Sequence, residues 1–387
     1  MEIRRAVGAA TLAVLCFPGD VLGFALTTIK PGVRSADASS TGRLKASSAE
    51  ATDFGRLIGD RVASAIVGSP LYPFLKKQAK DTMKESAKNI GVKWDEEVAH
   101  LRDAKDWDAA LADLVRDSPV ETSPEYLKPF HTYPEGNLCW EAAWEQHLAS
   151  QAVGVRNFPN DARNGERLLR EAYEKQMERL GVVVEKGGLV VDLGCGTGMS
   201  TRRLAEQHPS AGHVVGLDLS PHMVLVGQFL GERGENVDPR VDLRYADARN
   251  TGLPDGSASL VSICLVLHEM WAEGRREMLE EAYRILRPGG SLAIMEMDPS
   301  APGYVSLRQN PMVFSIMRST EPYLDVYFSE AGNIDAELQQ VGFSTVRKSM
   351  ATGRHFTVVA MKGGSLDLRS GDEKMDTHLQ SHKAGVW

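Results

Sequence analysis

The spacing of apolar residues changes character near residue 163. Before that point apolar side chains recur at helical intervals, as Val98, Leu101, Leu111 and Leu114 do. The helices predicted from this pattern span 69–91, 94–115 and 140–153. A stretch rich in proline and aromatic residues, 118–140, predicts an ordered loop or a boundary. We therefore expect residues 53–162 to form a helical N-terminal region, or cap.

After residue 163, short apolar runs alternate with amphipathic segments. The predicted strands are 188–194, 213–219, 241–247, 259–269 and 291–298. The predicted helices are 164–181, 200–209, 220–234 and 272–290. Strands that alternate with helices at this spacing predict a parallel sheet with helices on both faces. The expected fold class is therefore α/β, with a doubly wound and mostly parallel sheet.

The C-terminal third departs from this alternation. An inserted lid is predicted near 303–330, where the strand–helix rhythm stops. A helix at 330–343 and strands at 345–350 and 355–363 follow it. We expect the folded domain to span 163–362. Residues 363–387 are polar and lack periodicity, which predicts a disordered tail.

The first 52 residues have the composition of targeting segments. Residues 1–23 join two arginines to an apolar run that is shorter than the ~20 residues of a membrane span, which predicts a signal peptide. Residues 24–52 are rich in Ser and Thr and poor in acids, as transit peptides are, and we expect them to be disordered. The pair resembles the bipartite presequence of algal plastids. The alternative is a plain signal peptide for the secretory pathway, followed by a spacer.

Composition narrows the class of partner. The 387 residues are 42% hydrophobic and 25% charged, as in soluble globular proteins, and the net charge of −8 argues against nucleic acid as a partner. The four cysteines form no CxxC pair, and no metal-binding motif is present, so no metal is expected, although a magnesium-dependent catechol type stays open. No stable membrane span is expected, and the sequence leaves the oligomeric state open.

The segment VDLGCGTG follows the first predicted strand and carries three glycines, Gly194, Gly196 and Gly198. Glycine lets a ligand lie against the backbone. The spacing is not the GxGxxG of dinucleotide sites, and no Gly-Lys-Ser/Thr of a phosphate loop is present. The loop therefore predicts a ligand other than a phosphate group.

Two acids follow the next two predicted strands. Asp218 lies 20 residues beyond Gly198, the distance at which an acid reaches a ribose in this architecture. Asp247 ends the third strand, where it could accept a hydrogen bond from an adenine amino group or simply cap a helix. A glycine loop and two acids at successive strand ends predict adenosine bound without phosphates.

These features resemble the class I S-adenosylmethionine-dependent methyltransferases, specifically the type 11 (UbiE-like) group of cyanobacteria and plastids. Four motifs carry the resemblance over 163–362: VDLGCGTG, GLDLS, ADA and LRPGG. Ala258 and Ser259 depart from it, since the family commonly has Phe-Asp there. The resemblance implies a seven-stranded Rossmann-like sheet with S-adenosyl-L-methionine as cofactor. The cofactor-binding residues it implies are Asp192, Gly194, Gly196, Gly198, Asp218, Leu219, Met223, Asp247 and Ala248.

The acceptor side is less defined. His268, after the fourth strand, is the expected general base, and Glu269 could orient it; the alternative is a hydrogen-bonded loop histidine. Two aromatic segments could roof the acceptor pocket or simply pack in the core. Their pocket residues would be Tyr133, Trp140, Trp144, Glu321, Tyr323 and Tyr327.

The predicted function is methyl transfer to a small organic acceptor by in-line displacement, in an algal plastid. The acceptor could be a phenol or prenylquinone, an amine, or a thioether acid used for a sulfonium osmolyte. The alternative is a non-catalytic protein that binds S-adenosylmethionine for assembly or regulation. The glycine spacing argues against a nicotinamide-dependent oxidoreductase.

Overall fold

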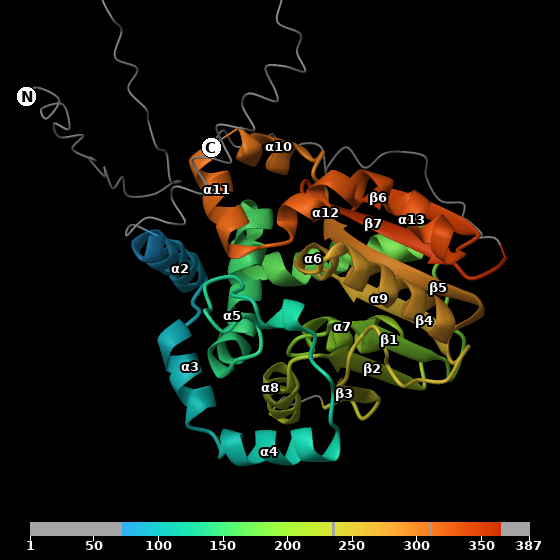
Figure 1. Ribbon diagram of the computed structural model, residues 1–387, viewed down its shortest axis with the longest axis horizontal. Helices are drawn as coiled ribbons and strands as arrows, with labels where there is room; N and C mark the ends of the chain where they lie inside the picture. Colours follow the sequence, from blue (N-terminus) through green and yellow to red (C-terminus); the bar gives the residue numbers. More distant parts are fainter. Residues whose placement is uncertain (1–71, 234–236, 310, 365–387) are drawn as a thin grey trace, which may run out of the picture. The chain divides into compact units, whose positions relative to one another are not determined.

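The computed structural model describes residues 72–233, 237–309 and 311–364 (Figure 1). All of them belong to one compact unit, Ser47–Met375. The predicted signal peptide (1–23), the transit-like segment (24–52) and nearly all of the predicted tail lie outside the described residues.

A seven-stranded sheet organises the described chain. Its strands are β1 (Leu189–Leu193), β2 (His213–Asp218), β3 (Val241–Tyr245), β4 (Ala258–Cys264), β5 (Leu286–Met297), β6 (Thr345–Met350) and β7 (His355–Met361). The strand order is β3-β2-β1-β4-β5-β7-β6, and β7 alone runs antiparallel to its two neighbours. The prediction of a doubly wound, mostly parallel sheet is therefore confirmed. The order reverses between β1 and β4, and ligands bind at such a point in open α/β sheets.

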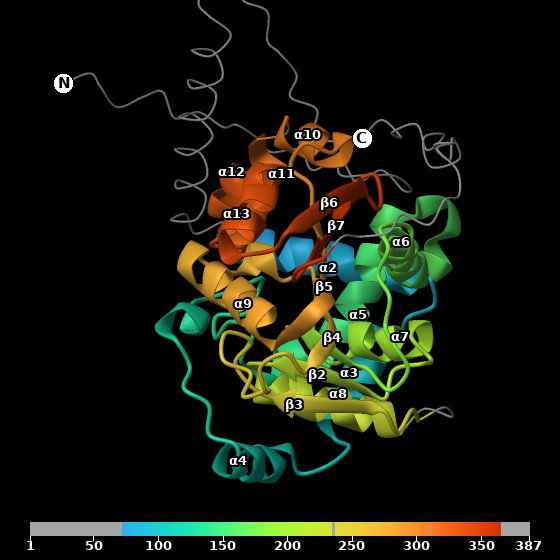
Figure 2. The ribbon, with the colours of Figure 1, turned by 90° about the vertical axis from the view of Figure 1, so that its right-hand side faces the viewer.

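Alternate residues of the central strands enter two separate cores. Val191 and Leu193 of β1 pack with α9 (Ala272–Ile285) and α13 (Ile334–Val341). Val190, which precedes Val191 and faces the other side of the sheet, packs with α6 (Gly165–Arg179) and α7 (Met199–Gln207). Figure 2 shows these two helix pairs on opposite sides of the sheet. The sheet is thus covered on both faces, as its apolar strands require.

The remaining helices lie in the N-terminal region and around the sheet. They are α2 (Tyr72–Asn89), α3 (Trp94–Arg102), α4 (Trp107–Asp117), α5 (Trp140–Asn157), α8 (Pro221–Glu232), α10 (Pro302–Arg308), α11 (Pro311–Thr320) and α12 (Leu324–Glu330). Short 3₁₀ turns are η1 (Pro124–Leu127), η2 (Pro159–Asn164), η3 (Leu267–Glu269) and η4 (Ala331–Asn333). The helical N-terminal region is therefore present, and α10 to α12 occupy the segment predicted as a lid.

Element boundaries depart most from the sequence-based expectation at three places. The helix predicted at 94–115 is two helices, because the side chain of Asp106 accepts from the amide of Ala109 and starts α4 afresh. The strand predicted at 259–269 ends at Cys264, since Leu265 has a left-handed φ of +60°. The helix predicted at 272–290 ends at Ile285, and β5 begins at once. The first two differences come from a cap and from a left-handed residue, which hydrophobic spacing does not encode.

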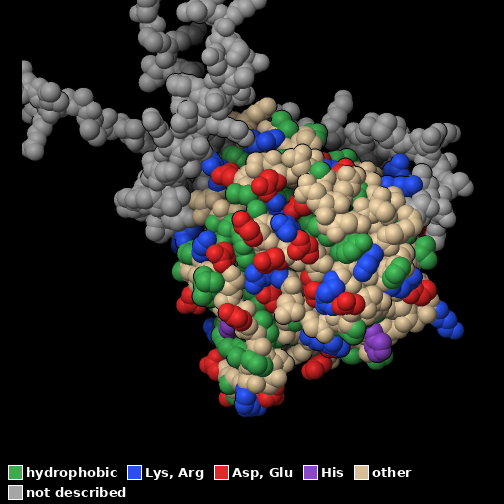
Figure 3. Space-filling view, turned by 45° about the vertical axis from the view of Figure 1, so that its right-hand side comes forward, with side chains coloured by type: hydrophobic (Ala, Val, Ile, Leu, Met, Phe, Trp, Pro, Cys, Tyr) green, Lys and Arg blue, Asp and Glu red, His purple; other side chains and the backbone are tan. Residues whose placement is uncertain are grey.

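No helix among the described residues has the length and apolarity needed to cross a membrane. On the face seen in Figure 3, acidic and basic side chains of the described residues alternate with apolar ones. That face therefore carries no extended field of one sign.

Candidate active site

The glycine loop turns sharply at the carboxyl end of β1. Gly194, Gly196 and Gly198 have φ of +72°, +54° and +77°, a region that other L-residues rarely adopt. A Cβ on Gly194 would lie 2.7 Å from the Val266 side chain, and one on Gly198 would lie 2.6 Å from Leu243. Both the conformation and the close packing therefore require glycine here.

Asp218 ties the end of β2 to this loop. Its Oδ2 accepts from the amide of Gly196 at 2.7 Å, and its Oδ1 accepts from the amide of Ser220 at 2.8 Å. Burial raises the pKa of Asp218 to about 6, against the lowering effect of these two amides. Each carboxylate oxygen keeps a second lone pair, so the group can still accept from a diol.

Asp192 lies beneath the loop. Its Oδ2 accepts from the hydroxyls of Ser200 and Thr201, at 2.6 and 2.8 Å, at the start of α7. Its Oδ1 is buried and has no hydrogen-bond partner among the described residues. Burial raises the pKa of Asp192. The carboxylate thus anchors α7 under the glycine loop and keeps one oxygen unused.

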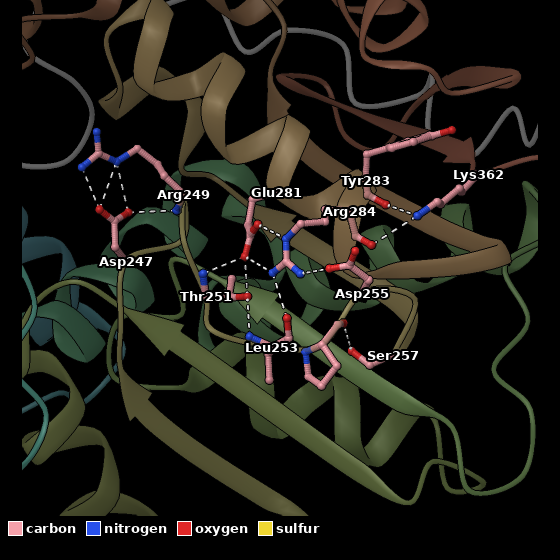
Figure 4. A network of polar contacts seen from close by, with 11 residues as sticks. Asp247, Arg249, Thr251, Leu253, Asp255, Ser257, Glu281, Tyr283, Arg284 and Lys362 are labelled. Carbon is pink, nitrogen blue, oxygen red and sulfur yellow. Dashed lines mark hydrogen bonds and ion pairs between the residues drawn. The ribbon is translucent and has the colours of Figure 1, made fainter.

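Asp247 is paired with a neighbouring arginine (Figure 4). Its carboxylate accepts from the Arg249 guanidinium, with Oδ2 2.7 Å from Nη2, and from the Arg249 amide. The guanidinium also lies over the rings of Tyr126 and Trp271, 5.9 and 5.1 Å from their centroids. The acid predicted to face adenine therefore already has a cationic partner, which the sequence analysis did not foresee.

The segment after Asp247 is fastened to α9. Glu281 accepts from the amide and hydroxyl of Thr251 at 2.7 and 2.6 Å, and it pairs with Arg284 (Figure 4). Arg284 donates in turn to the carbonyl of Leu253. These bonds fix the loop that carries Asp247.

The other three predicted cofactor residues are apolar and buried. Ala248 belongs to the core under α9, and Met223 packs with the N-terminal helices. Leu219 is also buried, next to Asp218. All nine predicted residues lie at the carboxyl ends of β1, β2 and β3 or in the segments that follow them. The structure therefore brings the three motifs to one edge of the sheet.

The N-terminal region closes over this edge. The hydroxyl of Thr197, in the glycine loop, donates to Gln146 Oε1 of α5. The hydroxyl of Ser220, at the start of α8, donates to the carbonyl of Asn137 at 3.2 Å. Nothing in the local sequence around Gln146 and Asn137 marked them as site residues, because their role depends on how α5 packs against the sheet.

His268 is held by a buried carboxylate that the sequence analysis missed. Its Nδ1 lies 2.8 Å from Glu296 Oε1, on β5, and its amide donates to Glu296 Oε2 at 3.2 Å. Burial by itself lowers the pKa of His268, but Glu296, together with Glu321 and Glu269, raises it to about 10. The sequence does contain one sign of this role, because an acidic residue, Glu296, interrupts an otherwise apolar strand.

Glu269 faces a different set of partners. Its Oε2 accepts from Asn137 Nδ2 at 2.9 Å, and its Oε1 lies 3.9 Å from His268 Nε2. Burial raises the pKa of Glu269 to about 7, against the lowering effect of His268. Glu296, and not Glu269, is therefore the group that orients the imidazole.

The predicted acceptor residues fall into two groups. Glu321 faces His268, and its buried Oε2 has no hydrogen-bond partner among the described residues. Tyr327 also lies near, with its ring centroid 6.2 Å from that of His268. Tyr323 instead donates to the carbonyl of Glu125, which fastens the 3₁₀ turn η1.

Tyr133, Trp140 and Trp144 line a separate cavity of about 350 Å³. Trp140 and Trp144 stack with centroids 5.9 Å apart, and Trp140 donates to Asp108 of α4. Tyr133 donates to Glu145, which also pairs with Lys80. These contacts tie α2, α4 and α5 together and do not include His268.

Within the described ranges, no three His, Cys, Asp or Glu side chains are arranged to hold a metal ion.

Residues 190–290 match a family model described as a methyltransferase domain. A demethylmenaquinone methyltransferase of Listeria welshimeri is 36% identical over 123 residues, 31% of this chain and 50% of that protein. The chain thus spans about half the length of these curated relatives.

Two further matches extend over more of the chain. An uncharacterized methyltransferase of Synechocystis is 29% identical over 178 residues, 46% of this chain and 77% of that protein. The solved phosphoethanolamine N-methyltransferase 2 of Haemonchus contortus, in complex with S-adenosyl-L-methionine, is 14% identical. Its TM-score is 0.42, and the match covers 60% of this chain and 62% of that one.

The strand order, the glycine loop at the end of β1 and the matched domain model agree with one another. Residues 190–290 therefore belong to a class I S-adenosylmethionine-dependent methyltransferase domain.

Proposed function

We propose that the protein transfers a methyl group from S-adenosylmethionine to a small acceptor that carries a hydroxyl group on an aromatic ring, a phenol or a quinol. The observation that carries the donor assignment is Asp218, whose carboxylate is half-buried at the end of β2 and bonded to the glycine loop. Its remaining lone pairs suit the two hydroxyls of a ribose. Gly194, Gly196, Gly198 and Asp192 would hold the methionyl end beside it.

When bound, the donor supplies a methyl group already activated by its positive sulfur. The protein must then align the acceptor, exclude water and remove a proton where the acceptor carries one. Asp247 and Ala248 would receive the adenine. His268 is the group able to take a proton, because Glu296 fixes its Nδ1 and leaves Nε2 toward Glu269 and Glu321.

The pairing of His268 with Glu296 supports a hydroxyl acceptor over the alternatives. A thioether sulfur has no proton to lose, and a free amine reacts through its lone pair before any proton leaves. A phenol or quinol gains nucleophilicity when its proton is removed. The Listeria relatives are named for a quinone-derived acceptor, which agrees with this class.

Incubation with a labelled donor and three acceptor probes tests the proposal. We expect label in 1,4-naphthohydroquinone and none in a thioether acid or a primary amine. His268→Ala should abolish turnover and keep the affinity for S-adenosylhomocysteine, whereas His213→Ala, at the exposed start of β2, should change neither. Donor binding without transfer to any component of an algal metabolite extract would favour the non-catalytic alternative.

We further propose that the protein acts in a plastid. The support is the composition of residues 1–52, which combines a signal-like run with a transit-like stretch. A fusion of residues 1–55 to a fluorescent protein should accumulate in the plastid of an alga. Secretion of the fusion into the medium would contradict this proposal.

A further inference from the structure

The loop before α5 brings a histidine and an amide to the carboxylate that faces His268. Asn137 Nδ2 donates to Glu269 Oε2 at 2.9 Å, and Asn137 Oδ1 lies 3.2 Å from His131 Nδ1. His131 Nε2 lies 3.8 Å from Glu269 Oε1. The loop itself is anchored, because the amide of His131 donates to the carbonyl of Thr320 at 2.6 Å.

The amide of Asn137 decides which nitrogen of His131 carries hydrogen. Its nitrogen donates to Glu269, so its oxygen must accept, and the hydrogen therefore sits on Nδ1 of His131. A neutral His131 thus presents an unprotonated Nε2 to Glu269 Oε1. That nitrogen can take a proton from the carboxyl group.

His268 presents the matching nitrogen on the other side. Both oxygens of Glu296 accept, from the amides of Met297 and His268, so Nδ1 of His268 carries the hydrogen of the bond to Oε1. Nε2 of His268 is left to face Glu269 Oε1 at 3.9 Å. One carboxylate oxygen therefore lies between two imidazole nitrogens.

Exposure increases along this row. The side chain of His268 is 10% exposed, that of Glu269 is 28% exposed, and that of His131 is 41% exposed. Glu321 faces both imidazoles from the start of the α12 segment and stabilises a proton on either. The row thus leads from the buried base to solvent.

We propose that His268, Glu269 and His131 form a proton path between the acceptor and solvent, with Asn137 as the positioning residue of its outer half. The use of the path in turnover rests on the proposed function, but its existence does not.

As the methyl group joins the acceptor, the acceptor O–H bond breaks and its proton bonds to His268 Nε2. Side-chain movements of about 1 Å bring each pair, now 3.9 and 3.8 Å apart, within hydrogen-bond distance; that proton then passes to Glu269 Oε1, next to His131 Nε2, and leaves to water. One proton leaves for each methyl group transferred, and no group is oxidised or reduced.

The path also solves a difficulty at His268. The three carboxylates around it hold its proton, so it must lose that proton before it can act as a base. A nearby carboxylate that passes protons outward gives this proton a route to solvent, since direct contact of a buried imidazole with water is limited.

A measurement without any acceptor tests the path. In the full chain labelled with ¹⁵N-histidine, NMR gives the rate at which the Nε2 proton of His268 exchanges with water. His131→Asn removes the imidazole, and asparagine tolerates the left-handed φ of +50° at this position. We expect exchange at His268 to slow at least tenfold, while His213→Asn leaves it unchanged.

Unchanged exchange in His131→Asn would overturn the path. Glu269→Gln supplies a second variant, because a glutamine cannot pass the proton on, and it should slow exchange to the same extent. Circular dichroism verifies that each variant is folded.

A turnover measurement with naphthohydroquinone separates this inference from the proposed function. His131→Asn should lower kcat, keep the affinity for S-adenosylhomocysteine, and regain turnover as imidazole buffer is added. A kcat equal to that of the wild type at every buffer concentration would overturn the use of the path in turnover. If the wild type methylates no probe, the proposed function fails, and the exchange rates still decide the path.

Discussion

His268 differs from an ordinary histidine because each of its ring nitrogens faces a carboxylate. Glu296 is fully buried on β5 and bonded to Nδ1, whereas Glu269 lies beyond Nε2. A buried charge pair of this kind favours the imidazolium, so the free base is the minor form at neutral pH. The pH dependence of turnover should therefore reflect the raised pKa of His268.

We predict that turnover rises with pH toward a midpoint near 10, because the base must lose its proton first. In Glu296→Gln the largest raising charge is gone and burial still lowers the pKa of His268, so the midpoint should move to lower pH. The rate should also be lower in its plateau, because the base is weaker. Measured kcat from pH 6 to 10.5 tests this, and an unchanged midpoint in the variant would contradict it.

The pair of His268 and Glu296 should also make the stability of the fold depend on pH. The folded-state pKa of His268 is raised above its unfolded value, so the pair stabilises the fold fully below about pH 6.5. This stabilisation should be lost as pH rises through 10. Urea unfolding gives the free energy of unfolding of the wild type and of His268→Asn at pH 6 and pH 10. The difference in this free energy between the two proteins should be smaller at pH 10. A larger difference at pH 10 would exclude the assigned charge state.

Asp218 should make donor affinity depend on pH. Its pKa is raised to about 6, and ribose hydroxyls donate best to the ionised form. Affinity for S-adenosylhomocysteine should therefore fall as pH drops below 6. Asp218→Asn should weaken binding about 10- to 100-fold and remove this dependence, as expected for a lost charge-assisted hydrogen bond. Titration calorimetry at pH 5 and 7.5 measures the affinity for S-adenosylhomocysteine and its pH dependence. An affinity in Asp218→Asn equal to that of the wild type would argue against the ribose role of Asp218.

At the scale of elements, α5 and α6 meet at two glycines. A Cβ on Gly154 would lie 2.2 Å from the amide nitrogen of Glu166, and one on Gly165 would lie 2.3 Å from the carbonyl oxygen of Gly154. The two backbones therefore touch directly. Because α6 packs on the sheet and α5 carries Gln146, this contact sets where Gln146 lies over the glycine loop.

We predict that Gly154→Ala destabilises the fold by about 2–3 kcal/mol, since a methyl group there forces the helices apart. Gly231→Ala is the matched control, because the nearest atom to its new Cβ, on Arg202, is 3.7 Å away. Alanine in α8 should leave stability unchanged or raise it by up to about 1 kcal/mol. Urea unfolding compares the two, and equal stability of both variants would mean that α5 and α6 can separate at little cost.

At the scale of the whole described chain, the N-terminal helices and the methyltransferase domain share one core. Trp107, Ala142 and Ala143 pack with Met223 and Val226 of α8. The same α8 begins at Ser220, beside Asp218. The boundary predicted at 162/163 therefore divides a continuous apolar cluster, and the N-terminal side supplies Gln146 and Asn137 to the site.

A fragment of residues 163–362 should consequently lose donor binding. Without α4 and α5 the apolar face of α8 is exposed, which favours aggregation. We expect affinity for S-adenosylhomocysteine to fall at least 100-fold relative to a fragment of residues 53–364. Calorimetry and light scattering on both fragments test this. Equal affinity would show that the N-terminal region is not required for the donor site.

Local pattern determined much of this protein. The alternation of apolar runs after residue 163 predicted the doubly wound sheet, because strand and helix periods are set by each residue's near neighbours. The glycine spacing and the acids at 218 and 247 predicted the edge of the sheet where the site lies, because parallel strands end on the same side.

Tertiary structure alone decided which groups meet. Glu296 reaches His268 across 28 residues, and Asn137 reaches Glu269 across 132, so no spacing rule links them. Tyr133, Trp140 and Trp144 were grouped with Glu321 by composition, yet packing sends them to a separate cavity. The physical reason is that the periodicity of apolar residues indicates on which face of a helix or strand a side chain lies. Which residue it contacts depends on how elements far apart in the sequence pack together.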